Sequence, residues 1–156
     1  MNRELMVHAW VPNEWDDVLL TRVEGRLQLP GGPAVAAPTN EDAVIEHVRA
    51  QAGLNVVPLR PIATDRWTAG DGPDSHHVIY LCAHVPSAGL MNGSPLGGSV
   101  QAVWAGENTP LHGMAPTPSA QFATVRNAWA HVGIVGLTDG RTWAPARALT
   151  PARPPG

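Results

Sequence analysis

The first part of the chain alternates short apolar runs with turn residues, which predicts strands. Residues 5–11 are mostly apolar and end at Pro12-Asn13, and residues 18–23 form a second apolar run. Both segments are expected to be β-strands because residues that favour turns follow them. Glu24-Gly25-Arg26 resembles a turn and leads into residues 27–29, which we interpret as a partner strand.

A helix with clear start and stop signals follows a glycine-containing segment. Pro30-Gly31-Gly32 is expected to form a turn, and the proline-bounded residues 33–38 are expected to form a loop. Thr39 is a favourable N-cap residue, and Gly53 is suited to end the helix. The predicted helix covers about residues 41–52. Its apolar stripe consists of Val44, Ile45, Val48 and Ala52.

Two strands of different character come next. Residues 55–67 are interrupted near Pro58 and Pro61, whereas residues 77–85 are almost continuously apolar. The continuous run predicts a central strand that is covered on both faces. Residues 69–74 between the two strands are expected to form a hairpin loop.

The last part of the chain predicts one more strand and one more helix. Residues 86–99 are expected to be a flexible connection, and residues 100–104 a short strand. A helix is expected to start at Thr117-Pro118 and to end at Gly133. Its apolar positions, spaced by three or four residues, are Phe122, Val125, Trp129 and Val132. This order of elements predicts an α/β fold in which a sheet packs between helices.

The length and hydropathy of the chain favour one small domain. A chain of 156 residues with 44% apolar residues can form one domain with a sizeable core. No apolar run is long enough to span a bilayer, and the N-terminus lacks the apolar segment of a signal peptide. We therefore expect a cytoplasmic protein without a membrane partner. We assign residues 1–143 to a single domain and residues 144–156 to a proline-rich C-terminal tail.

Charge and cysteine content exclude several classes of function. The net charge is −3, and the ten basic residues are all Arg and are scattered, so no nucleic-acid partner is expected. The single Cys82 excludes an internal disulfide and a cysteine-rich zinc site. The absence of Lys excludes Schiff-base chemistry and is typical of a high-GC bacterial genome. A homodimer stays open, because many sheet-sandwich proteins of this size pair.

One stretch resembles a known family. The sequence LLTRVEGRLQLPGG at residues 19–32, followed by a loop, a helix and Ala52-Gly53-Leu54, resembles the Nudix hydrolases. The hallmark of that family is G-x5-E-x7-R-E-U-x-E-E-x-G-U, where U is an aliphatic residue. The resemblance covers about residues 5–132. It implies a Nudix-type α/β/α sandwich with a central mixed β-sheet.

Aligned from its end, this degenerate motif keeps its scaffold positions and differs at its polar ones. The matching glycine and aliphatic positions are Gly32, Val48, Gly53 and Leu54. The polar positions are occupied by Pro38, Glu46, His47, Ala50 and Gln51. In the family, the positions of His47, Ala50 and Gln51 are glutamates that hold divalent cations, and these cations bridge a diphosphate and activate water. We therefore expect neither Mg²⁺ nor another cofactor, because Mg²⁺ prefers anionic oxygen ligands.

His47 and Gln51 are the candidate catalytic residues. They share one helical face at i, i+4 spacing, where the resemblance places the site of the family. Two interpretations stay open. The pair acts as a general acid/base or as hydrogen-bond partners of a ligand, or it belongs to a solvated helix face.

Candidate ligand-binding residues come from other segments. Trp67 precedes the predicted hairpin loop and is suited to stack on a ring, with packing in the core as the alternative. His77 lies at the start of the predicted central strand, where successive side chains face opposite sides. The remaining candidates are Arg22, which suits an anionic group, together with Gln28 and Glu46.

A metal site at His76-His77 is a weaker alternative. It would need a third ligand, for which His47 or His84 is conceivable, and it would favour zinc or another transition metal. We assign no metal site to the sequence.

Three functions remain open from these residues. We favour a Nudix-fold protein that binds a nucleotide-like or other small-molecule ligand without Mg²⁺-dependent pyrophosphate hydrolysis. The first alternative is a repurposed enzyme, for example in specialised-metabolite biosynthesis, with metal-independent acid/base chemistry centred on His47. The second is a residual hydrolase whose metal ligands come from other loops. The fold alone does not choose between these functions.

Overall fold

The computed structural model describes residues 4–68, 73–89, 100–129 and 133–142, and a six-stranded sheet runs through this part of the chain. In order across the sheet its strands are β4 (Gly31–Pro33), β1 (Glu4–Trp10), β6 (Ser75–Cys82), β5 (Pro58–Trp67), β8 (Val135–Thr138) and β9 (Arg141–Thr142). The pairs β1–β6 and β5–β8 are parallel and the other pairs are antiparallel. The predicted mixed sheet is therefore confirmed. The proposed tail at residues 144–156 lies outside the described residues.

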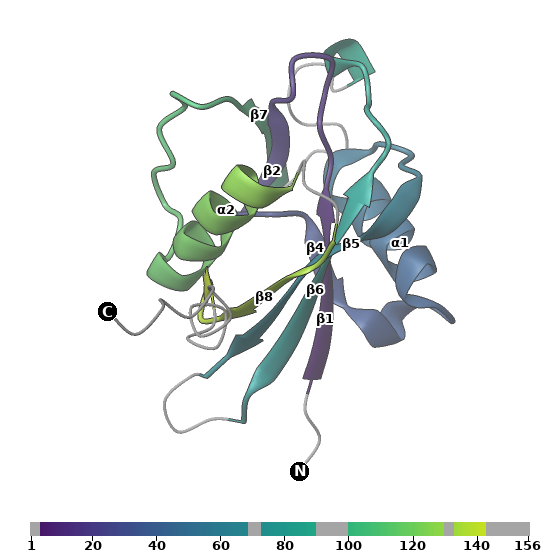
Figure 1. The fold of residues 1–156 in the computed structure, drawn as a ribbon. Coiled ribbons are helices and arrows are strands. Elements are labelled where there is room, and N and C mark those ends of the chain that lie inside the picture. Colours follow the sequence, from purple (N-terminus) through teal and green to yellow (C-terminus); the bar gives the residue numbers. More distant parts are fainter. Residues whose placement is uncertain (1–3, 69–72, 90–99, 130–132, 143–156) are drawn as a thin grey trace.

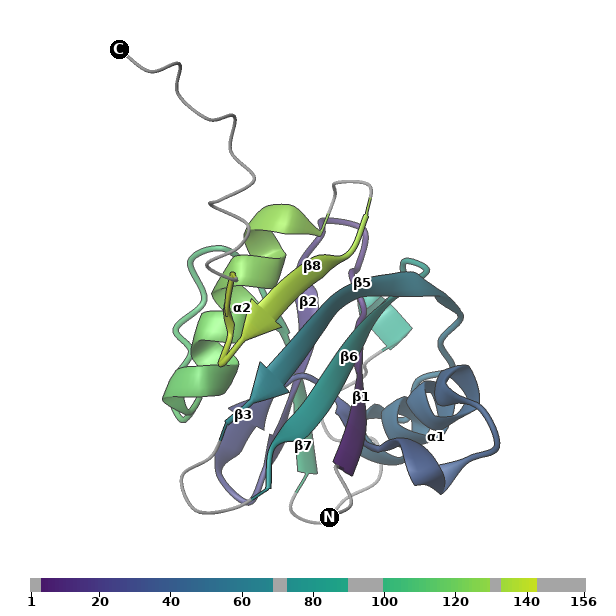
Figure 2. The ribbon, with the colours of Figure 1, turned by 60° about the horizontal axis from the view of Figure 1, so that its bottom comes forward.

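A second sheet and two helices complete the fold. The second sheet is antiparallel and has the order β3 (Arg26–Gln28), β2 (Val18–Val23) and β7 (Val100–Ala105). Helices α1 (Asn40–Ala52) and α2 (Pro116–Ala128) lie on opposite sides of the strands in both ribbon views (Figures 1 and 2). Two short 3-10 helices, η1 (Ala34–Ala36) and η2 (Ser87–Gly89), lie in connections. The predicted α/β/α sandwich is confirmed. None of the described helices is long and apolar enough to cross a membrane.

Each helix packs on its own hydrophobic core. Val44 and Val48 of α1 belong to one cluster, which includes Val7 of β1. Phe122 of α2 belongs to the other cluster, together with Trp10, whose ring centroid lies 5.2 Å from that of Phe122. Val7 and Trp10 are separated by an odd number of positions, so β1 directs them to opposite faces of the sheet.

Helix α1 begins and ends through the residues that predicted it. The Thr39 hydroxyl oxygen accepts a hydrogen bond from the Asp42 backbone N–H at 3.1 Å. Gly53 adopts a left-handed conformation with φ of 68°, and its N–H donates to the Arg49 carbonyl oxygen at 2.9 Å. An N-cap of this kind stabilises a helix by about 1 kcal/mol. The boundary prediction for this helix is confirmed to within one residue.

The prediction of a turn at Pro30-Gly31-Gly32 is wrong, because Gly31 and Gly32 lie in β4 and pair with β1. A Cβ added to Gly31 would lie 2.2 Å from the Val7 carbonyl oxygen, and one added to Gly32 would lie 2.5 Å from the His47 ring. The glycines thus let β4 approach its neighbours closely, which is a second use of glycine besides turn formation.

The C-terminal part of the described chain differs from the predictions at the start of α2 and in two additional strands. Helix α2 begins at Pro116 and has Ala115 at its N-cap, because Pro116 already provides the fixed φ that suits the first helical turn. The predicted position Val132 lies outside the described residues. Strands β8 and β9 were not predicted. Asp139 and Gly140 join them with φ of 51° and 81°, values typical of a two-residue hairpin turn.

The predicted central strand is β6, which lies between β1 and β5 but covers residues 75–82 in place of 77–85. In β5 the pairing register shifts between Pro58 and Arg60 and between Pro61 and Ala63. These shifts lie where the two prolines predicted interruptions, because proline cannot donate to a strand ladder.

Candidate functional site

A cavity of about 450 Å³ lies between the six-stranded sheet, β3 and the start of α2. The sheet contributes His8, His77 and Trp67 to its lining, β3 contributes Gln28, and α2 contributes Gln121. Of these five residues, Gln28, Trp67 and His77 were predicted to bind a ligand. A concave and largely apolar site with a few polar groups is typical of small-molecule binding.

Three rings on adjacent strands form one wall of the cavity, here called the ring ladder: Trp67 on β5, His77 on β6 and His8 on β1. The Trp67 and His77 ring centroids are 3.8 Å apart with 26° between the ring planes. The His77 and His8 centroids are 5.0 Å apart with 16° between the planes. The rings stack because side chains on one face of neighbouring strands lie beside each other.

A chain of hydrogen bonds runs along the two histidines. His8 Nε2 and His77 Nδ1 are 2.8 Å apart, and His77 Nε2 lies 2.9 Å from the Ser75 Oγ. One nitrogen of the histidine pair must donate and the other must accept, so this bond requires a deprotonated nitrogen. Nδ1 of His8 is buried without a hydrogen bond of its own to the described residues.

Both histidines are therefore uncharged near neutral pH. Burial is the largest cause that lowers the pKa of His8 to about 4, and the nearby His47 lowers it further, while the Leu29 carbonyl acts in the opposite direction. Burial also lowers the pKa of His77 to about 3, helped by the proximity of His8 and His76. The wall of the cavity is consequently aromatic, polar and neutral.

Asp65 fixes the position of two cavity residues. It is 2% exposed, and its Oδ2 accepts hydrogen bonds from Trp67 Nε1 and from Gln121 Nε2, each at 2.9 Å. Its Oδ1 accepts from the Gly140 backbone N–H at 3.2 Å. A Cβ at position 140 would lie 2.5 Å from the Gln121 backbone nitrogen, so a glycine is required there. One carboxylate thus connects β5, α2 and the β8–β9 turn.

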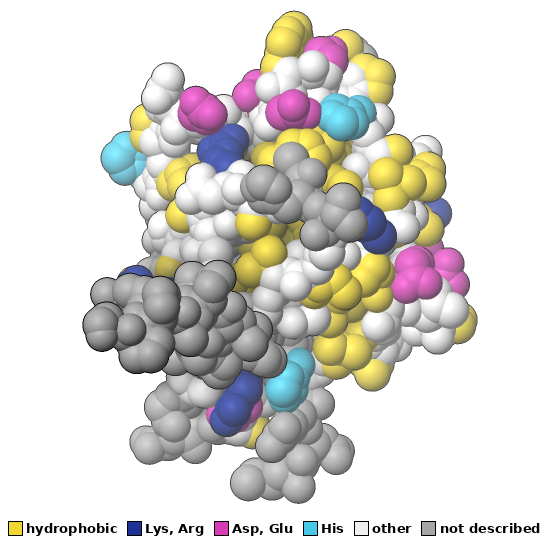
Figure 3. Space-filling view, viewed as in Figure 1, with side chains coloured by type: hydrophobic (Ala, Val, Ile, Leu, Met, Phe, Trp, Pro, Cys, Tyr) yellow, Lys and Arg dark blue, Asp and Glu magenta, His cyan; other side chains and the backbone are white. Residues whose placement is uncertain are grey.

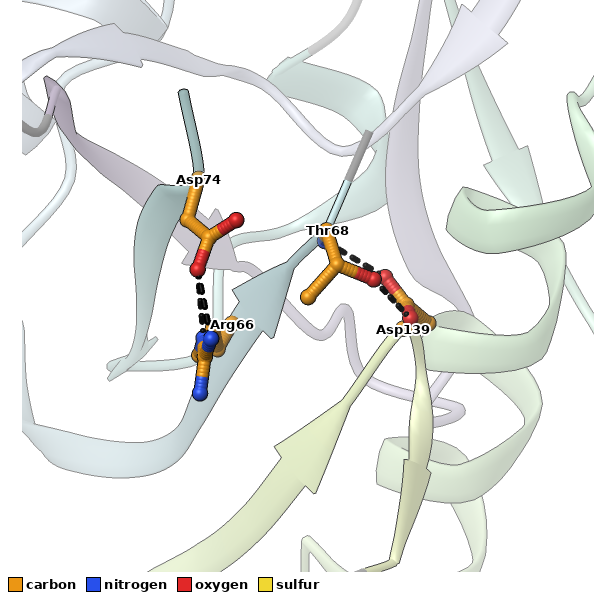
Figure 4. Close-up of polar contacts among 4 residues, drawn as sticks. All are labelled: Arg66, Thr68, Asp74 and Asp139. Carbon is orange, nitrogen blue, oxygen red and sulfur yellow. Dashed lines mark hydrogen bonds and ion pairs between the residues drawn. The ribbon is translucent and has the colours of Figure 1, made fainter. Parts of the chain in front are cut away.

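Further contacts hold the end of β5 in place (Figure 4). The Thr68 N–H donates to Asp139 Oδ1 at 2.8 Å, and the Thr68 hydroxyl donates to Asp139 Oδ2 at 2.6 Å. These bonds lower the pKa of Asp139. Arg66 Nε donates to Asp74 Oδ2 at 2.8 Å, and Asp74 lies directly before β6. Both ends of the segment that carries Trp67 are therefore tied to other elements.

The candidate catalytic residues His47 and Gln51 lie together on α1 and contact the backbone of β4. Gln51 Nε2 donates to the Gly31 carbonyl oxygen at 2.7 Å, and the Gly31 N–H donates to Gln51 Oε1 at 3.1 Å. His47 Nε2 donates to the Pro33 carbonyl oxygen at 2.9 Å. Gly31 lines the cavity, whereas the His47 and Gln51 side chains fasten β4 and are not part of the lining.

The structure places the other predicted residues away from the cavity. Arg22 donates to the Gly25 carbonyl oxygen at 3.2 Å within the β2–β3 turn. Glu46 is exposed and forms an ion pair with Arg49 on the surface of α1. On the face shown in Figure 3, the basic side chains lie apart from one another.

The histidines considered as metal ligands do not converge. His76 lines a different hollow, together with Leu5 and Arg66, and His84 Nε2 forms a hydrogen bond with Asp16 Oδ1 at 2.7 Å. Among the described residues, no group of three or more His, Cys, Asp or Glu side chains is placed to hold a metal ion.

The sequence interpretation missed three residues of the site, His8, Asp65 and Gln121. His8 carried a signal, because it is a polar residue among the apolar residues of its strand and is buried in the structure. Asp65 carried little signal, because the polar residues Thr64 and Arg66 flank it in β5. Gln121 carried none, because a glutamine in a helix is usually exposed and its partner Asp65 lies 56 positions away.

Comparisons with known proteins agree with the fold. No protein-family model matches the sequence, and no curated protein matches it. An ADP-ribose pyrophosphatase from Streptococcus suis is similar in structure, with a TM-score of 0.62 and 23% identity over 88% of this chain and 99% of that chain. A MutT protein from Bacillus halodurans gives a TM-score of 0.58 and 16% identity over 83% and 81% of the two chains. A NUDIX hydrolase from Nitrosomonas europaea gives 0.57 and 15% over 88% and 79%.

Proposed function

The chain has the fold of the Nudix hydrolases, and we propose that it binds a small-molecule ligand in the cavity without Mg²⁺-dependent hydrolysis of a pyrophosphate. The residues that line the cavity come from five strands, α2 and the segments next to them, which is typical of a site assembled by a complete fold. The proposal places the ligand beside the ring ladder and makes α1 a scaffold helix.

The observation that carries the proposal is that the His47 and Gln51 side chains form hydrogen bonds within the protein. Both are hydrogen-bonded to the backbone of β4, and the third position on that helical face is the methyl group of Ala50. Mg²⁺ binds anionic oxygen ligands in octahedral geometry, and none of these three groups is anionic. Without the ion, neither water activation nor neutralisation of a diphosphate is available from this face.

Acid/base catalysis centred on His47 is the alternative that the contacts favour less. A general base must lie within hydrogen-bond reach of the proton that it removes. His47 Nε2 already donates to the Pro33 carbonyl oxygen, and the side chain lies outside the lining of the cavity. A residual hydrolase would require metal ligands from elsewhere in the chain.

Two measurements test the proposal. Isothermal titration with Mg²⁺ and Mn²⁺ should show no tight binding, and incubation with ADP-ribose and Mg²⁺ should release no AMP. A metal-dependent pyrophosphatase serves as the positive control. Micromolar metal affinity, or AMP release that chelation abolishes, would refute the proposed loss of hydrolysis. His47→Ala should leave ligand binding in the cavity unchanged, whereas the His47-centred alternative requires a loss.

A further inference from the structure

We propose that the cavity takes an uncharged ring compound and disfavours ligands that carry a phosphate or another anionic group. This inference rests on the proposed binding function and assigns a chemical class to its ligand. Three properties of the cavity carry it: the shape and character of its walls, the lack of a charged side chain in the buried part of its described lining, and the polar groups that remain without partners.

The walls are suited to a flat or bulky apolar body. The ring ladder presents three rings that are already stacked, and Asp65 holds the Trp67 indole in position. The other walls are mostly apolar and include Leu27, Leu29, Pro116 and Pro118. Ring–ring contacts in offset or edge-to-face geometry contribute about 0.5–1.5 kcal/mol beyond the burial of area. Prolines and a fixed indole also lose little conformational entropy when a ligand binds.

The buried part of the described lining offers no counterion for an anion. The lining contains no Asp, Glu or Lys, and its one Arg is Arg26, an exposed residue at the start of β3. The two histidines of the wall are neutral, and the depressed pKa values show that a proton on either ring is unfavourable. Burying a charged group without a partner costs far more than burying a neutral one. A phosphate would therefore be poorly accommodated.

The same lining still offers hydrogen bonds to a neutral group. Gln121 uses Nε2 to bind Asp65, and its Oε1 has no hydrogen bond to the described residues. The amide of Gln28 likewise makes no side-chain hydrogen bond within the described part of the chain. Together they provide a donor and two acceptors for hydroxyl, amide or ring N–H groups.

Matched pairs of probes with the same ring test the inference. We suggest 2-naphthol with 2-naphthyl phosphate, and indole with indole-3-carboxylate, measured by saturation-transfer NMR near neutral pH. The neutral member of each pair should bind at least about tenfold more tightly than its anionic partner. Trp67→Ala should weaken the binding of the neutral probes by a similar factor, and Trp15→Ala is the matched control, because Trp15 is 70% exposed and lies outside the lining.

The outcomes separate the two proposals. If the anionic probes bind the cavity as tightly as the neutral ones, the ligand class is wrong and the proposed binding function stands. If neither kind of probe binds in a Trp67-dependent manner, both proposals fail. Should Trp67→Ala not fold, Gln28→Ala provides the second variant, because its side chain is only half-buried and lines the same cavity. Weaker binding of the neutral probes to that variant is then the expected result.

Discussion

On the α1 side of the six-stranded sheet, His47 and Gln51 form hydrogen bonds to the backbone of β4. On the α2 side, His8, His77 and Asp65 bind other side chains and hold the wall of the cavity. The first region carries the resemblance to a hydrolase motif, yet its polar groups fasten the fold. The second region has no motif, and its polar groups shape a hollow. In this chain the motif therefore identified helix α1 correctly, but it did not indicate that His47 and Gln51 form hydrogen bonds with β4.

The largest effect on stability is expected from substitution of Asp65, the carboxylate that connects elements on the α2 side. Asp65→Asn keeps one acceptor oxygen and replaces the other with an N–H₂ group, which would face either the Gly140 N–H or the donors of Trp67 and Gln121. Leaving buried donors unpaired should lower the free energy of unfolding by roughly 2–5 kcal/mol, measured by urea denaturation. Asp74→Asn is the matched control; its ion pair with Arg66 is partly exposed, so a loss below about 1 kcal/mol is expected. Equal losses in the two variants would show that Asp65 has no special structural role.

Acidic pH should lower the stability of the protein, because folding keeps the cavity histidines His8 and His77 neutral. The folded-state pKa of His8 is about 4, below its ordinary value of 6.5, so the unfolded state binds more protons between these values. Stability is therefore complete above 6.5 and falls as the pH decreases, by about 2 kcal/mol from His8 alone near pH 5. His77, with its pKa lowered to about 3, acts in the same direction. The slope of unfolding free energy against pH should flatten in His8→Gln, and an unchanged slope would contradict the neutral pair.

A double-mutant cycle of Gly32 and His47 tests whether the close approach of β4 to α1 requires a glycine. Gly32→Ala would place a Cβ 2.5 Å from the His47 ring and should cost about 1–3 kcal/mol of stability. In the background of His47→Ala the same substitution should cost much less, because the ring that it meets is gone. Additive losses in the denaturation cycle would mean that Gly32 is required for another reason.

The smallest effect is expected from the hydrogen bonds between Gln51 and Gly31. Gln51→Ala removes both hydrogen bonds to Gly31 and should reduce stability by about 1–2 kcal/mol, while binding in the cavity changes little. Glu46→Ala, which removes an exposed ion pair on the same helix, should cost less than about 0.5 kcal/mol. Loss of binding in Gln51→Ala at unchanged stability would move the functional site back to α1.

The fold was predictable where short-range signals suffice. Thr39 and Gly53 set the ends of α1 through contacts with residues three or four positions away. The role of Gly31 and Gly32 was not predictable in this way, because it depends on Val7 and His47, which are distant in sequence. The cavity likewise combines residues that local sequence signals identify with properties that depend on distant contacts. Trp67 and His77 border a hairpin and were identified locally, whereas the neutrality of the ladder depends on burial against elements from the whole chain.

The two-sided contact of Gln51 with Gly31 has a consequence for which side chains position 51 can accept. An amide serves both the Gly31 N–H and the Gly31 carbonyl oxygen because it carries a donor and an acceptor. A glutamate at position 51 would still accept from the N–H but would set an anionic oxygen against the carbonyl. Gln51→Glu would therefore weaken the attachment of β4 before any ion could be bound. At position 51 the attachment of β4 therefore opposes an acidic side chain, and Gln51→Glu is expected to give a less stable fold.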